Sequence, residues 1–303
     1  MLEALLDRFR RGDRLALSRL LSLVARGHDP EPILGGIGQI QKHARIVALT
    51  GSGGVGKSTL VGELIELARG QDLSVAVLAC DPQSPLSGGA LLGDRFRMPT
   101  RPGDDGVFIR SLAAAAGHGA VAEHLEPMTR LLEAFGFDLI FLETVGAGQG
   151  DTAVRALADV LVLLLQPEAG DDLQWEKAGL LEVADIIAIH KADLPGAERV
   201  EAQVRAALDL SDGRVVPVVR VSSKTGEGVD SLWQAIMACC HRRGTSGHAT
   251  HALLQHAQHV LAARFAQAQT AQDQQLQQII SQWQQGQLSQ ADAVRALFHY
   301  LSR

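Results

Sequence analysis

The chain is poor in cysteine, in long hydrophobic runs and in positive charge, and each shortage excludes a class of protein. Its 303 residues include three cysteines, Cys80 and the adjacent pair Cys239 and Cys240. An odd number with one adjacent pair makes a poor disulfide framework, which favours a reducing compartment. The wholly apolar run from Val160 to Leu165 is far too short to cross a bilayer.

The charge balance and the first residues narrow the classes further. A net charge of −6 argues against a nucleic-acid-binding surface as the main function. Glu3 and Asp7 stand among the first apolar residues, which suits neither a signal peptide nor a transit peptide. Because 46% of the residues are hydrophobic and 20% charged, we expect a sizeable core. The expected protein is cytoplasmic and binds neither nucleic acid nor a membrane.

The stretch from Gly51 to Thr59 fits the phosphate-loop pattern G-x-x-x-x-G-K-[ST]. An apolar run before it predicts a buried strand, and apolar residues at helical spacing after it predict a helix. Glycines let several backbone N–H groups point at one phosphate, and the helix N-terminus adds positive potential. Lys57 would reach the β- and γ-phosphates, and the Ser58 hydroxyl would ligate Mg²⁺. The predicted nucleotide-binding residues here are Gly53, Gly54, Val55, Gly56, Lys57, Ser58 and Thr59.

From about residue 45 to 240, predicted strands alternate with predicted helices. This alternation is typical of an α/β fold, a mostly parallel sheet with helices on both faces. Strands are predicted at 45–50, 73–79, 107–110, 137–142, 160–165, 185–189 and 215–221, and helices at 118–135, 172–182, 197–209 and 229–241. Ligands of such sheets bind at the carboxyl ends of the strands.

Acidic residues follow two of these strands. Asp81 closes the strand at 73–79, and Asp94 stands in the loop beyond it; both are candidates for holding Mg²⁺ or its water shell. A helix cap for Asp81 and a solvated carboxylate for Asp94 are the alternatives. Glu143 closes the strand at 137–142 as a Mg²⁺-contacting carboxylate does in nucleotide hydrolases. Gln149 would orient the attacking water, unless it is simply an exposed loop residue.

Two further loops carry the features of a guanine-reading site. His190-Lys191-Ala192-Asp193 stands where such a loop normally reads Asn-Lys-x-Asp. The Asp193 carboxylate would accept hydrogen bonds from guanine N1 and N2, a donor pair that adenine lacks. Imidazole is not expected to reproduce the paired contacts of the usual amide, so His190 predicts looser affinity. In the second loop, a backbone N–H of Ser222, Ser223 or Lys224 would meet guanine O6.

The two ends of the chain are predicted to be helical. We expect three parts: an N-terminal helical extension at 1–44, a nucleotide-binding domain at 45–242 and a C-terminal helical arm at 243–303. The arm shows helical stretches at 249–268 and 273–301, and Ser289 with Asp292 would cap a final helix. Helices with a thin apolar stripe suit dimerisation or docking, and a packed cap is the alternative.

Beyond the phosphate loop, the chain resembles the MeaB/ArgK family of cobalamin-mutase-associated P-loop GTPases. The resemblance covers about residues 8 to 240, and its loop motifs are specific. It rests on Gly12–Leu17, Asp81–Pro85, Ser87–Arg95, Phe108–Ser111, Glu143–Gln149 and Ala169–Gln174.

The resemblance implies a catalytic set and a biological role. Lys57, Asp94, Glu143 and Gln149 would be catalytic, and Ser58, Asp81, Asp94 and Glu143 would hold Mg²⁺. The ligands would be GTP and GDP with Mg²⁺. The chain would form a homodimer through its C-terminal helices and bind a cobalamin-dependent acyl-CoA mutase of the methylmalonyl-CoA mutase type. It would gate adenosylcobalamin loading and protect or reactivate that mutase.

Two other functions stay open. A nickel-insertion metallochaperone GTPase has the cluster His248, His251, His256 and His259 as its support. A kinase for an amino-acid transport system is the older interpretation of the family, and no residue of the sequence supplies an acceptor site for it. No arginine finger is identifiable, so we expect slow intrinsic turnover that a partner stimulates.

Overall fold

The computed structural model describes residues 2–40, 42–82, 104–114, 120–144, 154–155, 157–167, 178–209, 215–240, 254, 257, 260–262 and 264–301. The chain forms two compact units, Met1–Arg243 and Gly244–Arg303. Among the described residues, no helix combines the length and apolar composition needed to cross a membrane.

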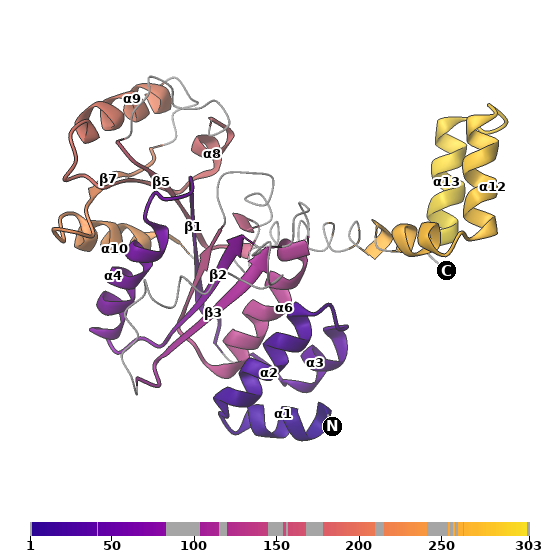
Figure 1. The fold of residues 1–303 in the computed structure, drawn as a ribbon, viewed down its shortest axis with the longest axis horizontal. Coiled ribbons are helices and arrows are strands. Elements are labelled where there is room, and N and C mark those ends of the chain that lie inside the picture. The colour runs from indigo at the N-terminus through magenta and orange to yellow at the C-terminus, as the bar shows by residue number, and fades with distance from the viewer. Residues whose placement is uncertain are drawn as a thin grey trace. The chain divides into compact units, whose positions relative to one another are not determined.

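A seven-stranded parallel sheet forms the centre of the first unit, which confirms the predicted α/β fold (Figure 1). The strands lie in the order β3-β2-β4-β1-β5-β6-β7, so β1 lies between β4 and β5. Their bounds are β1 Arg45–Gly51, β2 Val75–Pro82, β3 Val107–Ala114, β4 Leu139–Glu143, β5 Val160–Leu165, β6 Ile186–His190 and β7 Val218–Val221. Nearly continuous apolar runs such as β5 are expected where helices cover both faces of a parallel sheet.

Successive residues of β1 point to opposite faces and so belong to different cores. Ile46 and Ala48 join the cluster under the N-terminal helices, whereas Val47 and Leu49 join the opposite cluster. Helices α4 (Lys57–Arg69) and α10 (Val229–Ala238) fill the second cluster. On the first face lie α6 (Ala120–Phe135), α8 (Ala178–Val183) and α9 (Ala197–Asp209).

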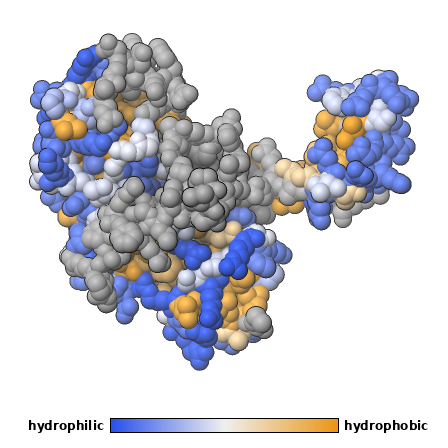
Figure 2. Space-filling view, viewed as in Figure 1, coloured by the Kyte–Doolittle hydropathy of each residue, from blue (hydrophilic) through white to orange (hydrophobic). Residues whose placement is uncertain are grey.

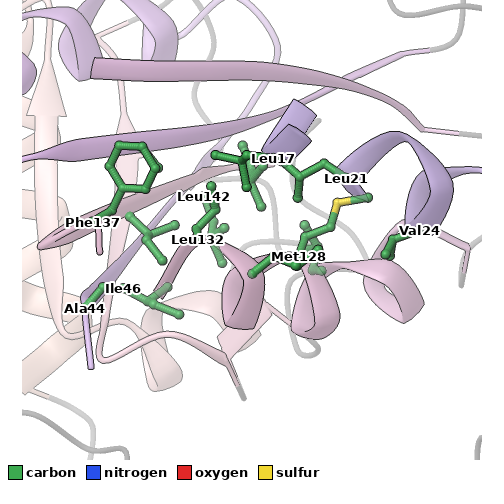
Figure 3. Packing of buried hydrophobic residues seen from close by; sticks show 14 of the residues in the cluster. Leu17, Leu21, Val24, Ala44, Ile46, Met128, Leu132, Phe137 and Leu142 are labelled. Carbon is green, nitrogen blue, oxygen red and sulfur yellow. The ribbon is translucent and has the colours of Figure 1, made fainter. Parts of the chain in front are cut away.

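The N-terminal helices share the core of the sheet. They are α1 (Leu2–Arg10), α2 (Arg14–Ala25) and α3 (Glu31–Gly36). Figure 3 shows Leu17 and Leu21 of α2 beside Met128 and Leu132 of α6, in the same cluster as Ile46 of β1. Arg14 adds hydrogen bonds to the carbonyls of Asp105 and Val107, which fix α2 to the start of β3.

Several element boundaries differ from the sequence-based expectations. β3 runs to Ala114, four residues beyond the predicted end at 110, because its whole length pairs with β2. β7 begins at Val218 because Pro217 lacks the N–H that a paired strand donates. The predicted strand at 185–189 is shifted by one residue, so His190 is the last residue of β6.

The C-terminal unit contains a pair of packed helices. α12 (Gln274–Gln284) and α13 (Gln290–Leu301) are separated at Gly286, whose φ of 72° ends the helical path, so the helical stretch expected at 273–301 consists of two helices, the second of them the predicted final helix. The Ser289 hydroxyl accepts from the Asp292 N–H at 3.2 Å, which confirms the predicted cap. Trp283, Val294 and Phe298 keep half or more of their surface exposed, and Figure 2 shows an apolar patch on this unit.

Candidate nucleotide-binding site

The phosphate loop connects the central strand to α4, as the motif predicts. Gly54 and Gly56 have φ values of 77° and 99°, in the left-handed region that glycine adopts at low cost. A Cβ on Gly51 would lie 2.5 Å from the Leu164 carbonyl oxygen, so a larger residue would separate β1 from β5. The N-cap of α4 is Gly56, which has no side chain to bond to the first N–H groups of the helix, and such helix N-termini are typical binding sites for phosphate.

Lys57 folds back into the loop that precedes it. Its Nζ donates to the carbonyl oxygens of Gly51 at 2.9 Å and Ser52 at 3.2 Å, and the residue is 7% exposed. Both of these acceptors are neutral carbonyls. The side chain can exchange one such contact for a phosphate at small cost, because a charged acceptor makes the stronger hydrogen bond.

Ser58 and Glu143 meet beside this loop. The Ser58 Oγ donates to Glu143 Oε1 at 2.7 Å, and both residues are 6% exposed. The register of β1 and β4, in which Leu49 pairs with Glu143, brings the two side chains together. A hydroxyl and a carboxylate oxygen are donors of the kind that Mg²⁺ prefers, so this pair fits the metal that the sequence predicts.

A second link joins the strands at the same edge of the sheet. Thr144 Oγ1 lies 3.1 Å from Thr50 Oγ1, and the Thr144 N–H donates to the Leu49 carbonyl at 3.1 Å. These bonds connect the ends of β1 and β4 directly below the phosphate loop. Sequence reasoning did not predict the contact between Thr50 and Thr144, because their meeting depends on strand register.

His190 connects the phosphate loop to the loop after β7. Its Nδ1 lies 2.6 Å from the Val55 carbonyl oxygen and its Nε2 lies 2.8 Å from Ser223 Oγ. Each ring nitrogen thus has one protein partner, and the looser nucleotide affinity expected from the missing amide stays a prediction. Since burial lowers the pKa of His190, the ring is neutral near pH 7. A carbonyl only accepts, so Nδ1 carries the hydrogen and Nε2 accepts from Ser223.

The turn after β6 places Asp193 beside the β7 loop. Lys191 has a φ of 57°, a strained value for a residue with a side chain, and the Ala192 N–H donates to the Val221 carbonyl at 3.0 Å. Asp193 Oδ1 accepts from Ser222 Oγ at 2.7 Å. This hydrogen bond holds the pKa of the Asp193 carboxyl below its ordinary value, so the group is an ionised acceptor at neutral pH.

A tight turn after β7 supplies the remaining predicted residues. The Ser222 N–H donates to the Glu227 carbonyl at 2.9 Å, and the Gly226 N–H donates to the Ser222 carbonyl at 2.8 Å. Lys224 Nζ lies 3.8 Å from Asp193 Oδ2, on an otherwise exposed side chain. The base-reading candidates from β6 and β7 are therefore held together by hydrogen bonds of the protein itself.

Some predicted residues lie outside the described part of the chain. Asp81 lies near the end of β2, and its side chain is outside the described residues. Asp94 and Gln149 are outside them as well, and so are His248, His251, His256 and His259. The structure thus brings together Ser58 with Glu143, His190 with the phosphate loop, and Asp193 with Ser222.

The fold and this cluster of loops define a P-loop nucleotide hydrolase. The family model described as "Methylmalonyl Co-A mutase-associated GTPase MeaB" matches residues 17–282. The chain belongs to this family, which confirms the resemblance drawn from the loop motifs, and it is a GTPase that binds guanine nucleotide. The match extends into the C-terminal unit, beyond the limit at about residue 240 that the motifs indicated.

Individual relatives agree with the family assignment. A relative from Pyrococcus abyssi, named as a GTPase, is 42% identical over 243 residues, 78% of this chain and 75% of the relative. The fused isobutyryl-CoA mutase of Cupriavidus metallidurans is 37% identical over 254 residues, 80% of this chain and 23% of that protein. The crystal structure of a LAO/AO transport system kinase shares the fold, with a TM-score of 0.68, 24% identity and coverage of 100% and 98% of the two chains.

Proposed function

We propose that this GTPase holds GTP and Mg²⁺ across the carboxyl ends of β1, β4, β6 and β7, and that the bound nucleotide controls an acyl-CoA mutase. The controlled step is the loading of adenosylcobalamin into the mutase, together with protection or reactivation of the enzyme. The observation that carries the nucleotide site is the convergence of Ser58, Glu143, His190 and Asp193 on one edge of the sheet.

Each predicted phosphate-site and metal-site residue has a role in this proposal. Lys57 and the N–H groups of Gly53, Gly54, Val55, Gly56, Ser58 and Thr59 bind the phosphates. Ser58 and Glu143 hold Mg²⁺, with Asp81 and Asp94 as the further carboxylates that the sequence predicts. The ion supplies positive charge to the β- and γ-phosphate oxygens when it is bound. Gln149 orients the attacking water.

The base is read by the two loops beyond the sheet. The ionised Asp193 carboxylate accepts from guanine N1 and N2, and a backbone N–H of Ser222, Ser223 or Lys224 donates to guanine O6. The Lys191 side-chain stem covers the base. The preformed Asp193–Ser222 bond supports this assignment, because a carboxylate that is already oriented loses little freedom when guanine binds.

The partner is inferred from the family. Its description names methylmalonyl-CoA mutase, and a stretch that makes up 23% of a fused isobutyryl-CoA mutase matches this chain. Both mutases rearrange the carbon skeleton of a branched acyl-CoA. A free-standing cobalamin-dependent mutase of this chemistry is therefore the proposed client.

The proposed client relationship predicts a change in turnover. With a cobalamin-dependent acyl-CoA mutase from the same host, we expect phosphate release from GTP to accelerate by about tenfold or more, because the partner completes the site. Adenosylcobalamin transfer to the mutase, followed by its absorbance, should also depend on which nucleotide is bound. The proposal would be contradicted if the mutase did not change the rate of phosphate release and if adenosylcobalamin loading were the same with every nucleotide.

We also propose that the C-terminal unit mediates homodimerisation. Trp283, Val294 and Phe298 are 50%, 59% and 59% exposed, an apolar surface that a second copy would cover. Light scattering after gel filtration should give twice the chain mass for the wild type and a lower mass for Phe298→Asp. Val215→Asp is the matched control, since Val215 is 94% exposed in the first unit. A monomeric wild type would refute the dimer.

A further inference from the structure

A buried imidazole occupies the point where three nucleotide-site loops meet. His190 is 4% exposed and closes β6. One ring nitrogen bonds to the phosphate loop at the Val55 carbonyl, and the other bonds to Ser223 in the loop after β7. The ring also lies so close to Gly56 that any Cβ at that position would overlap it.

We propose that His190 is a positioning residue for guanine nucleotides, which fixes the distance between the phosphate-binding half and the base-binding half of the site. The inference rests on the nucleotide site proposed above. A nucleotide must satisfy both halves at once, so the spacing of the loops determines how much of the binding energy is realised.

The contacts around His190 form a continuous chain. Val55 is bonded to His190, which is bonded to Ser223; the neighbouring Ser222 is bonded to Asp193, the predicted base-reading carboxylate. The Ala192 N–H to Val221 carbonyl bond adds a second connection between the β6 and β7 loops. A movement of Ser223 away from the phosphate loop would therefore also displace Asp193.

The glycine at position 56 is explained by the same arrangement. Gly56 has a φ of 99° and precedes α4 as its N-cap, so the phosphate loop passes directly over the ring. The side of the ring therefore contacts the backbone whose N–H groups face phosphate. The imidazole therefore holds the phosphate loop at a fixed distance from the end of β6 by direct packing as well as by its two hydrogen bonds.

Burial has more influence on the pKa of His190 than the charged groups near the ring have. Lys191 on the same turn opposes protonation and Asp193 favours it, while removal from water is the largest influence in lowering the pKa. A neutral ring with hydrogen on Nδ1 suits both partners. An asparagine here would retain a donor toward Val55, whereas an alanine would lose both bonds and leave a cavity beside Gly56.

The test compares the affinities of GDP and ADP by calorimetry in four variants. We expect His190→Ala to weaken GDP binding by about tenfold or more, the effect of losing a buried hydrogen-bonded link. It should also reduce the preference for GDP over ADP, since Asp193 is no longer held. His190→Asn should retain affinity within about threefold of the wild type, and Ser223→Ala should weaken GDP by about threefold. His43→Ala, which removes a mainly exposed imidazole at 68% side-chain exposure, is the matched control and should bind as the wild type does.

The outcomes separate positioning from a general loss of stability. A structural role alone would lower the melting temperature while GDP and ADP affinities fell by the same factor or not at all, and this result would overturn the inference. So would His190→Asn binding as weakly as His190→Ala. If His190→Ala does not fold, an unaltered GDP affinity and GDP/ADP preference in Ser223→Ala would overturn it. A wild type that binds no GDP would refute the proposed nucleotide site itself.

Discussion

Replacing Lys57 with alanine should lower GTP hydrolysis by about a hundredfold or more. The ammonium lies inside the phosphate loop, where it donates to the neutral carbonyls of Gly51 and Ser52. Charge stabilisation by one such group at a transferring phosphoryl group contributes about 3 kcal/mol or more in related sites. Phosphate release at saturating GTP is the measurement.

A lysine outside the site provides the control. Lys42 pairs with Asp138 and its side chain is 73% exposed, so Lys42→Ala should hydrolyse GTP at the wild-type rate. If Lys57→Ala keeps more than half of the wild-type rate, the phosphate-loop assignment is wrong. A parallel melting curve shows whether the inactive variant is folded, as we expect because the hydrogen bonds to Gly51 and Ser52 join neighbouring segments of one loop.

Replacing Asp193 with asparagine should weaken GTP binding by roughly a hundredfold, because one of the two hydrogen bonds to guanine is exchanged for a repulsive donor–donor contact. The same variant should bind xanthosine triphosphate better than the wild type does. Xanthine carries a carbonyl where guanine carries its amino group, and an amide can donate to it. Fluorescence competition with both nucleotides gives the ratio of affinities.

The exposed Asp209 at the end of α9 offers a matched substitution. Asp209→Asn removes the same charge without touching the site and should leave both affinities unchanged. Equal losses of GTP and xanthosine triphosphate affinity in Asp193→Asn would mean that the carboxylate supports the loop without reading the base. An unchanged GTP affinity would remove Asp193 from the site.

Much of the fold was predictable because its signals are local. The apolar runs that became β1, β4 and β5 indicate strands covered on both faces, and the glycine pattern after β1 identifies the phosphate loop from one short stretch of residues. Glu143 and Asp193 were predicted from local signals too: Glu143 closes a recognisable apolar strand, and Asp193 is the last residue of the guanine-reading loop motif.

The contacts between distant segments were not predictable from local pattern. Val55 and His190 are 135 residues apart, and the sequence contains no sign that the imidazole would bond to that carbonyl. Thr50 and Thr144 meet only because β1 and β4 pair in one register. The cap at Ser289 predicted the start of the last helix, whereas the end of the preceding helix at Gly286 was not located, because apolar residues continue at helical spacing on both sides of it.

In the proposed site, the carboxyl edge of the sheet selects a guanine nucleotide. Calorimetric titration of the wild type with GDP and with ADP, each with Mg²⁺, tests it most directly. The geometry of Asp193, Ser222 and His190 predicts a one-to-one complex with GDP at least about a hundredfold tighter than with ADP. Equal affinities, tighter binding of ADP, or no heat of association with GDP would contradict the claim.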